Sequence, residues 1–193
     1  MGKTSVLHMF SKLGAHTFDA DSFVHDILTK PNIIRRIEKI LGINIKTNGS
    51  SKLSIDKKRV ADIIFADSDK RKAVENVIHP LVLKAMEKTE SRILKKDRSA
   101  IVIFEVPLLF EAGYDKFFDK TVVVWCNRKT AMHRLNRKGF SSEEALKRLR
   151  AQMSISKKKA LADFVIDNNH GLPRTEKKVK KIYQAISTDY SSA

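Results

Sequence analysis

Three short predicted strands, spaced among helical patterns, constrain the fold of this sequence more than any other feature. They are "AIVIFEV" (100–106) and "TVVVWC" (121–126), which are apolar at nearly every position, and "DFVIDN" (163–168). Runs that are apolar at nearly every position are typical of strands buried on both faces of a sheet. Strands that alternate with helices predict an α/β fold with a parallel, doubly wound sheet, which binds ligands beyond the carboxyl ends of its strands.

Apolar periodicity and capping residues predict the helices, with Asp56 as the N-cap of one and Ser141 and Glu144 as the capping box of another. The run after "GKT" carries Val6, Leu7 and Phe10 on one face and stops at Gly14. Pro80 is expected to begin a new helix, because proline fits the first turn of a helix better than its interior. The other predicted elements are a strand within 15–21, helices at 22–29, 31–41, 56–65, 66–79, 80–95, 128–137, 141–152 and 175–186, and a loop at 46–52.

The charge of the chain is strongly unbalanced. Lysine and arginine number 38 against 22 aspartates and glutamates, which gives a net charge of +16 over 193 residues. Such a charge attracts polyanions, namely nucleic acid, an anionic membrane or polyphosphate ligands, and does not choose among them.

Other features of the composition exclude several classes of protein. The single cysteine, Cys126, excludes an internal disulfide and a cysteine-cluster metal site, and within an apolar strand it is expected to serve packing. No run approaches about 18 apolar residues, and the N-terminus lacks the apolar core of a signal peptide. The sequence therefore predicts a soluble, cytoplasmic protein.

The chain begins "MGKT", and Gly2, Lys3 and Thr4 match the end of a phosphate-binding P-loop, G-x-x-x-x-G-K-[ST]. A helix follows them, as the motif requires. Lys3 would bind the β- and γ-phosphates of a nucleotide, Thr4 would bind Mg²⁺, and the helix N-terminus would add free N–H groups. The alternative is a chance tripeptide, because the first glycine of the motif and its strand would lie upstream of Met1.

Two aspartates close the first predicted strand in "FDAD". Asp21 stands where a carboxylate can hold a substrate hydroxyl and accept its proton, as kinases require. Alternatively, Asp21 is the N-cap of the helix at 22–29, which is a common use of aspartate. We expect Asp19 to have a structural role.

The segment after the strand at 100–106 combines carboxylates with apolar residues. Glu105 ends the strand and is a further candidate for orienting Mg²⁺ through water. The segment then continues with Pro107, Leu108, Leu109, Phe110 and Glu111. Leucines at such a place predict a wall for a substrate with an apolar part, or else a short core helix.

Arginines and one asparagine complete the candidates. Arg134, Arg137, Arg148 and Arg150 lie on two predicted helices joined by a loop. Such arginines either clamp phosphates over a nucleotide or remain exposed helix charges. Asn168, at the end of the last strand, either reads a base edge or simply terminates the strand.

Together these pieces resemble the dephospho-coenzyme A kinase family, over a match from Gly2 to about Ile186. The resemblance depends on the order and spacing of "GKT", "DAD" (19–21), "HPL" (79–81), "PLLFE" (107–111), "RLNR", "RLRAQM" (148–153) and "ADFVIDN" (162–168). It implies a P-loop kinase-like parallel sheet flanked by helices, with a helical substrate-binding insertion at about 28–96 and a short lid at about 128–152. It also implies ATP-dependent phosphorylation of the ribose 3′-hydroxyl of dephospho-CoA, the last step of coenzyme A synthesis.

The resemblance also implies a role for each matching residue at the nucleotide. Gly2, Lys3 and Thr4 would bind the phosphates of ATP, Thr4 would bind Mg²⁺, and Asn168 would be a further nucleotide contact. Asp21 would be the catalytic base.

The resemblance extends to the substrate side and the lid. His79, which is otherwise a histidine at a helix boundary, would contact dephospho-CoA together with Pro107, Leu108, Leu109, Phe110 and Glu111. Arg134 and Arg148 match the lid and transition-state arginines. Arg137 is an alternative to Arg134, because "RLNRKGFS" is shorter than the usual pattern.

The N-terminus departs from the family pattern. Family members begin with a strand and a glycine-rich loop that this sequence lacks, and that strand lies in the middle of the sheet. Its loss would leave buried backbone groups unpaired at about 1–3 kcal/mol each, against a total stability of about 5–15 kcal/mol. We therefore expect this form to be unstable or to fold with a gap, and to bind ATP poorly. Either the true start lies upstream of Met1, or this is an inactive short form.

Two other functions stay open. One is a P-loop kinase that acts on nucleosides or nucleotides. The other is a basic nucleic-acid-binding protein, although phenylalanine and tyrosine are not interleaved with lysine and arginine in an RNA-binding pattern. The anionic substrates of a dephospho-CoA kinase give the positive charge an equally good reason, since a positive cleft speeds their encounter.

Overall fold

The computed structural model describes residues 1–44, 56–150 and 152–191. The loop predicted at 46–52 lies outside the described residues. The chain divides into two units, of which Met1–Thr17 and Ser99–Ala193 form the first and Phe18–Arg98 forms the second.

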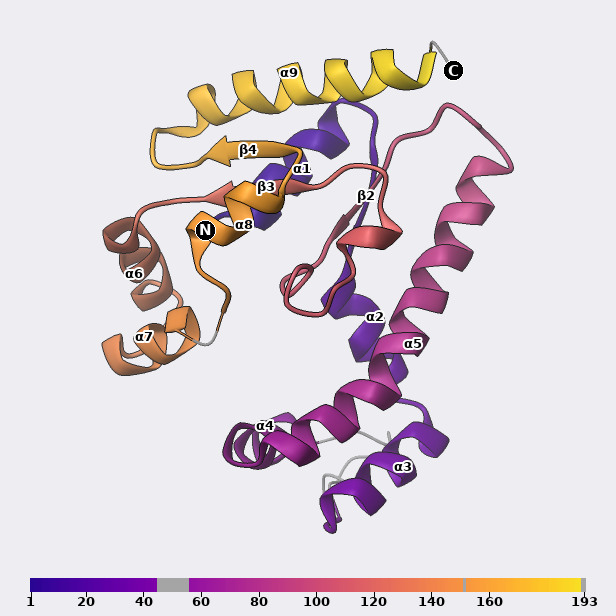
Figure 1. Cartoon of the computed structure of the whole chain (residues 1–193), viewed down its shortest axis with the longest axis vertical. Helices are drawn as coiled ribbons and strands as arrows, with labels where there is room; N and C mark the ends of the chain where they lie inside the picture. Colours follow the sequence, from indigo (N-terminus) through magenta and orange to yellow (C-terminus); the bar gives the residue numbers. More distant parts are fainter. Residues whose placement is uncertain (45–55, 151, 192–193) are drawn as a thin grey trace. The chain divides into compact units, whose positions relative to one another are not determined.

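The first unit combines strands with helices (Figure 1). Its elements are α1 (Lys3–Lys12), β2 (Val102–Glu105), a 3₁₀ helix (Asp115–Phe117), β3 (Val122–Trp125), α6 (Arg128–Asn136), α7 (Ser142–Arg150), α8 (Ile155–Leu161), β4 (Phe164–Asp167) and α9 (Leu172–Ser191). A further strand, β1 (His16–Asp19), begins in this unit. All four strands lie where the sequence predicts them.

The strands form two pairs. β3 and β4 are parallel, in a register that sets Val122 opposite Phe164 and Trp125 opposite Asp167. β1 pairs with β2, and next to this pair the His16 N–H donates to the Ile101 carbonyl at 2.9 Å. The predicted α/β class is thus confirmed, and within the described ranges the strands form two separate short sheets rather than one continuous sheet.

The core of the first unit lies between α1, the strands and α9. Figure 1 shows α9 running alongside β4, and the two elements are in contact. The shared cluster of buried apolar side chains includes Val6, Met9, Phe10, Val124, Ile166, Val179, Ile182 and Ile186. The apolar face predicted after "GKT" is therefore the face that α1 buries. Cys126 is also buried, as its apolar strand predicts.

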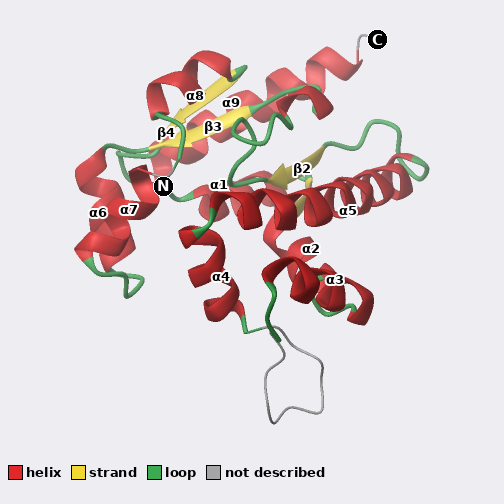
Figure 2. Cartoon of the chain, turned by 60° about the horizontal axis from the view of Figure 1, so that its bottom comes forward, coloured by secondary structure: helices red, strands yellow, loops and turns green. Residues whose placement is uncertain are grey.

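The second unit is built from helices, which Figure 2 colours red. They are α2 (Ala20–Ile27), α3 (Pro31–Leu41), α4 (Lys57–Ala66) and α5 (Ser68–Leu94). Three of them begin at an aspartate, Asp19, Asp56 or Asp67, whose side chain accepts a backbone N–H of the first turn. This capping satisfies donors that a helix leaves without an internal partner.

The prediction that Pro80 begins a new helix is wrong, because α5 continues through it. Val74 and Val77 before the proline and Val82 and Met86 after it are all buried. The two halves therefore pack as one helix, and this burial outweighs the backbone hydrogen bond that proline cannot donate. The Pro80 side chain itself is exposed to solvent.

Two further differences concern helices of the first unit. α9 begins at Leu172 instead of 175, and α8 is not predicted at all. α8 buries none of its side chains fully, so it shows no apolar periodicity for a sequence pattern to detect. No helix in the described ranges is long and apolar enough to span a bilayer.

Candidate functional site

The start of α1 in the first unit carries the motif "GKT". Gly2 is the N-cap residue, with a φ of 86°, a left-handed conformation that glycine adopts without strain. No side chain caps this helix and its first turn holds no acidic residue. Lys3 extends from the first turn, and its Nζ lies 3.5 Å from Oε1 of Glu105 at the end of β2.

Among the described residues, Glu105 is the carboxylate that pairs with Lys3. Its side chain is only 11% exposed, whereas that of Lys3 is 41% exposed. Its second oxygen, Oε2, is buried and has no hydrogen-bond partner within the described part of the chain. A buried carboxylate oxygen without a partner costs free energy, so Glu105 is suited to bind a further donor or a hydrated cation.

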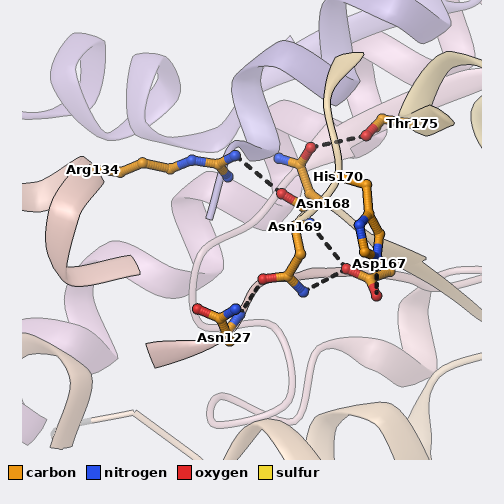
Figure 3. A network of polar contacts seen from close by, with 7 residues as sticks. All are labelled: Asn127, Arg134, Asp167, Asn168, Asn169, His170 and Thr175. Atoms are coloured by element: carbon orange, nitrogen blue, oxygen red, sulfur yellow. Dashed lines mark hydrogen bonds and ion pairs between the residues drawn. The ribbon is translucent and has the colours of Figure 1, made fainter. Parts of the chain in front are cut away.

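A network of hydrogen bonds joins Met1, just before this turn, to Arg134, Asn168 and Thr175, and Figure 3 shows the last three. Arg134 of α6 donates through Nη2 to the Asn168 carbonyl at 3.0 Å and through Nη1 to the Met1 carbonyl at 3.2 Å. The side-chain amide of Asn168 donates to the Met1 carbonyl at 2.8 Å and accepts from the Thr175 hydroxyl at 3.0 Å. The end of β4 is thereby joined to the residue that precedes the "GKT" turn.

A second chain of polar contacts links the ends of β3 and β4 (Figure 3). The Asn127 N–H donates to Asn169 Oδ1 at 2.7 Å, and Asn169 donates its backbone N–H to Asp167 Oδ1 at 2.9 Å. Burial raises the pKa of Asp167, but the donors of Asn169 outweigh it, so the net pKa is lowered. His170 Nε2 lies 3.8 Å from the same carboxylate.

Glu111 joins the "PLLFE" segment to the chain after α7. Its Oε1 accepts from Lys158 Nζ at 2.7 Å and from the Met153 N–H at 2.9 Å. Burial opposes ionisation of Glu111, but these donors outweigh it and the pKa of the carboxyl is lowered. The rest of the segment is half-buried except for Leu108, which is 43% exposed.

The second unit holds the other residues that the sequence singles out. The N-cap of α2 is Asp19, which accepts the Asp21 N–H at 3.0 Å, so the alternative that Asp21 is the cap is wrong. Asp21 is exposed in the first turn of α2. His79 lies inside α5, where burial lowers its pKa against an opposing effect of the Glu75 carboxylate.

The structure describes the side chains of two of the four predicted lid arginines, Arg134 and Arg137, and these two differ in burial. Arg134 is half-buried and engaged by two carbonyls, whereas Arg137 is exposed at the C-terminal end of α6. Arg148 and Arg150 lie on α7, and their side chains are outside the described part of the structure. The predicted capping box of α7 is confirmed, since the Ser141 N–H donates to Glu144 at 2.8 Å and the Glu144 N–H donates to Ser141 at 3.2 Å.

Sequence reasoning missed Thr175 and Lys158, and also Asn127, Asn169 and His170 of the second chain of contacts. Thr175 did carry a signal, because it shares the buried face of α9 with Val179, Ile182 and Ile186. A hydroxyl in an apolar stripe requires a partner. Lys158 carried no such signal in a chain so rich in lysine.

Within residues 1–44, 56–150 and 152–191 no three histidine, cysteine, aspartate or glutamate side chains lie together as a metal site.

Comparisons with known proteins agree on one family. The family model for dephospho-CoA kinase matches residues 1–174. A relative named dephospho-CoA kinase from Aquifex aeolicus is 33% identical over 97% of this chain and 93% of its own length. Another from Symbiobacterium thermophilum is 35% identical over 95% of this chain and 76% of its own.

Solved structures are similar over nearly the whole chain. The crystal structure of TT1252 from Thermus thermophilus has a TM-score of 0.81 at 27% identity and covers 95% of this chain and 91% of its own. The dephospho-CoA kinase from Campylobacter jejuni has a TM-score of 0.69 at 28% identity, over 98% and 93%. These matches do not support the expectation of a truncated N-terminus.

Proposed function

Because this chain belongs to the dephospho-CoA kinase family, we propose that it transfers the γ-phosphoryl group of ATP to the ribose 3′-hydroxyl of dephospho-CoA. The observation that carries the proposal is the start of α1, where Lys3 lies beside the buried carboxylate of Glu105. A helix N-terminus and an ammonium group together favour a polyphosphate ligand. A cytoplasmic location stays a prediction from the sequence.

Gly2, Lys3 and Thr4 bind the phosphates of ATP in this proposal. The first N–H groups of a helix have no internal acceptor, and α1 offers them neither a side-chain cap nor an acidic residue. Lys3 adds positive charge to the positive end of the helix dipole, which is unfavourable until an anion binds. Glu105 compensates part of that charge.

Mg²⁺ fits the same turn. It prefers oxygen ligands, keeps several waters, and is usually held by few protein groups together with substrate phosphates. We assign the exposed Thr4 as its protein ligand and Glu105, through the unpartnered Oε2, as the acceptor for its waters. When bound, the ion offsets negative charge on the β- and γ-phosphates.

The transfer itself is an in-line displacement. The ribose O3′ attacks the γ-phosphorus, the bond from that phosphorus to the β,γ-bridging oxygen breaks, and ADP leaves. Asp21 accepts the proton of the hydroxyl as general base, a role open to an exposed carboxylate that does not cap its helix. Lys3 offsets the charge that develops on the bridging oxygen.

The remaining predicted residues take the substrate and lid roles. His79 and the segment 107–111 bind dephospho-CoA, with the exposed Leu108 offering apolar surface. The segment at about 28–96 is the substrate-binding insertion, and 128–152 is the lid. Arg134 already donates to two carbonyls, so its guanidinium is less available to a ligand. We therefore assign phosphate binding in the lid to the exposed Arg137, together with Arg148.

Replacement of the proposed base tests the mechanism. Asp21→Asn keeps the shape of the side chain but cannot accept the proton, so kcat for dephospho-CoA should fall about 10²–10⁴-fold. The Kd for ATP should stay within a factor of about two, because the change leaves the "GKT" turn intact. Coupled measurement of ADP release gives kcat, and calorimetric titration gives the Kd.

A matched control is Asp26→Asn, an exposed aspartate on the same helix with no proposed role. It should retain the turnover of the unmodified chain. Equal turnover by Asp21→Asn would remove Asp21 from the mechanism. A panel of nucleoside monophosphates, run beside dephospho-CoA, separates this kinase from one that acts on nucleotides.

A further inference from the structure

Every polar group of Asn168 has a protein partner. Its backbone N–H donates to the Trp125 carbonyl at 2.8 Å, and its own carbonyl accepts from Arg134 at 3.0 Å. Its side chain donates to the Met1 carbonyl at 2.8 Å and accepts from the Thr175 hydroxyl at 3.0 Å. The residue is only 4% exposed, so its side chain presents almost no surface with which to read a base edge.

The partners fix how the amide of Asn168 is oriented. The Met1 carbonyl can only accept, so the NH₂ group must face it. The amide oxygen then faces Thr175, whose hydroxyl must donate. Figure 3 shows the two residues turned toward each other in this way. Thr175 is fully buried and therefore has little freedom to choose another partner.

The orientation of the Asn168 amide also determines the orientation of the peptide that begins the "GKT" turn. The carbonyl of Met1 and the N–H of Gly2 belong to one trans peptide unit and point in opposite directions. A carbonyl held by Asn168 and Arg134 therefore fixes the direction of the Gly2 N–H on the other side. Gly2 also packs directly on the amide, since a Cβ there would overlap Asn168 Nδ2.

We propose that Asn168 and Thr175 are positioning residues for ATP binding, which hold the Met1–Gly2 peptide so that its N–H and the first turn of α1 face the phosphates before ATP arrives. This inference rests on the proposed function, and specifically on phosphate binding at Gly2, Lys3 and Thr4. A turn fixed in advance loses little conformational entropy when the ligand binds, which raises affinity. Thr175 acts only through Asn168 and does not touch ATP.

A pair of variants at Thr175 tests the proposal. Thr175→Val keeps the shape but removes the donor to Asn168, and should raise the Kd for ATP·Mg²⁺ about tenfold, as the loss of one buried hydrogen bond predicts. Thr175→Ser keeps the hydroxyl and should restore the affinity to within about threefold. Both are measured by calorimetric titration of the full chain, with dephospho-CoA titrated in parallel.

The second ligand separates positioning from general damage. In Thr175→Val the Kd for dephospho-CoA should not change. An unchanged Kd for ATP, an equal loss in Thr175→Ser, or parallel losses for both ligands would each overturn the proposal. Asn168→Asp, which cannot donate to the Met1 carbonyl, should weaken ATP binding further. If that variant does not fold, the Thr175 pair still decides.

Failure of the inference and failure of the proposed function give different results. If the unmodified chain binds ATP but does not phosphorylate dephospho-CoA, the proposed function is wrong, and the Thr175 pair still measures the positioning effect on ATP. If the unmodified chain binds no ATP, both are wrong.

Discussion

The helix caps of the second unit and the polar groups around the "GKT" turn of the first unit are held in different ways. In the second unit the polar groups that start helices are aspartates with partners two or three residues away, such as Asp19 with Asp21 and Asp56 with Arg59. In the first unit the polar groups around the "GKT" turn have partners far along the chain, such as Asn168 with the Met1 carbonyl.

This difference has a physical consequence. Local caps stabilise one helix each and can be lost singly. Contacts between distant segments depend on the packed fold and set one another's geometry, so a change to one partner affects the others. We therefore expect changes to the contacts around the "GKT" turn to affect ligand binding, and changes to a local cap such as Asp56 to affect stability alone.

Among the substitutions considered, Gly2→Ala should have the largest effect, which is on the affinity for ATP. A side chain at a φ of 86° is strained by about 1–2 kcal/mol, and the new Cβ would displace the amide of Asn168. Together with the loss of the Asn168 contact, at about 1 kcal/mol, this strain should raise the Kd for ATP about 100-fold, since each 1.4 kcal/mol is a factor of about ten. Calorimetric titration of the full chain measures it.

The control for Gly2→Ala stands at the other end of the same helix. Gly14 also has a positive φ, 103°, and a Cβ there would meet the Tyr183 hydroxyl at 3.3 Å instead of Asn168. Gly14→Ala should lower the midpoint of thermal unfolding without changing the Kd for ATP. An equal loss of ATP affinity in both variants would show that strain in α1, and not the Asn168 contact, is responsible.

Asp56→Ala tests the expectation that a local helix cap in the second unit affects stability alone. It removes the cap of α4, whose carboxylate accepts the Arg59 N–H at 3.0 Å, and should lower the free energy of unfolding by about 1 kcal/mol. Chemical denaturation measures this loss, and Asp62→Ala, an exposed position in the same helix, is the control. A changed Kd for ATP would contradict the distinction between the two units.

Glu111→Gln should have the smallest effect. The pKa of Glu111 is lowered from 4.5, so its ionised form stabilises the fold above that pH, and this contribution is lost as the pH falls through the lower native value. The variant should be less stable at pH 7 by about 0.5 kcal/mol, because the pair with Lys158 is partly screened by solvent. The difference should shrink as the pH falls below 4.5 and vanish once the pH lies below the lowered native pKa. A difference that persists there would assign the effect to packing instead.

The sequence predicts the parts of the fold that local rules determine. The four strands, the Asp56 cap and the capping box of Ser141 and Glu144 follow from patterns within a few residues. The prediction that Pro80 begins a new helix is wrong, because the preference of proline for a first turn competes with the burial of apolar side chains on both sides of it in α5.

The candidate site is less predictable for the same reason. The motif "GKT" and its helix can be recognised from adjacent residues, and Glu105 from its place after a strand. The choice of the Met1 carbonyl as the partner of Asn168 and Arg134, and of Lys158 as the partner of Glu111, depends on which segments the fold brings together. From the sequence, Asn168 either reads a base edge or terminates the strand. Its contacts with Met1 and Thr175 suggest a third role, that of positioning the Met1–Gly2 peptide.

The most direct test of the account is the product made by the unmodified chain. The protein is incubated with ATP, Mg²⁺ and dephospho-CoA, and the products are identified by phosphorus NMR and mass spectrometry. The account predicts one ADP for each new phosphate monoester, with that phosphate on the 3′-oxygen of the ribose. Absence of that ester, or faster phosphorylation of a nucleoside monophosphate, would contradict it.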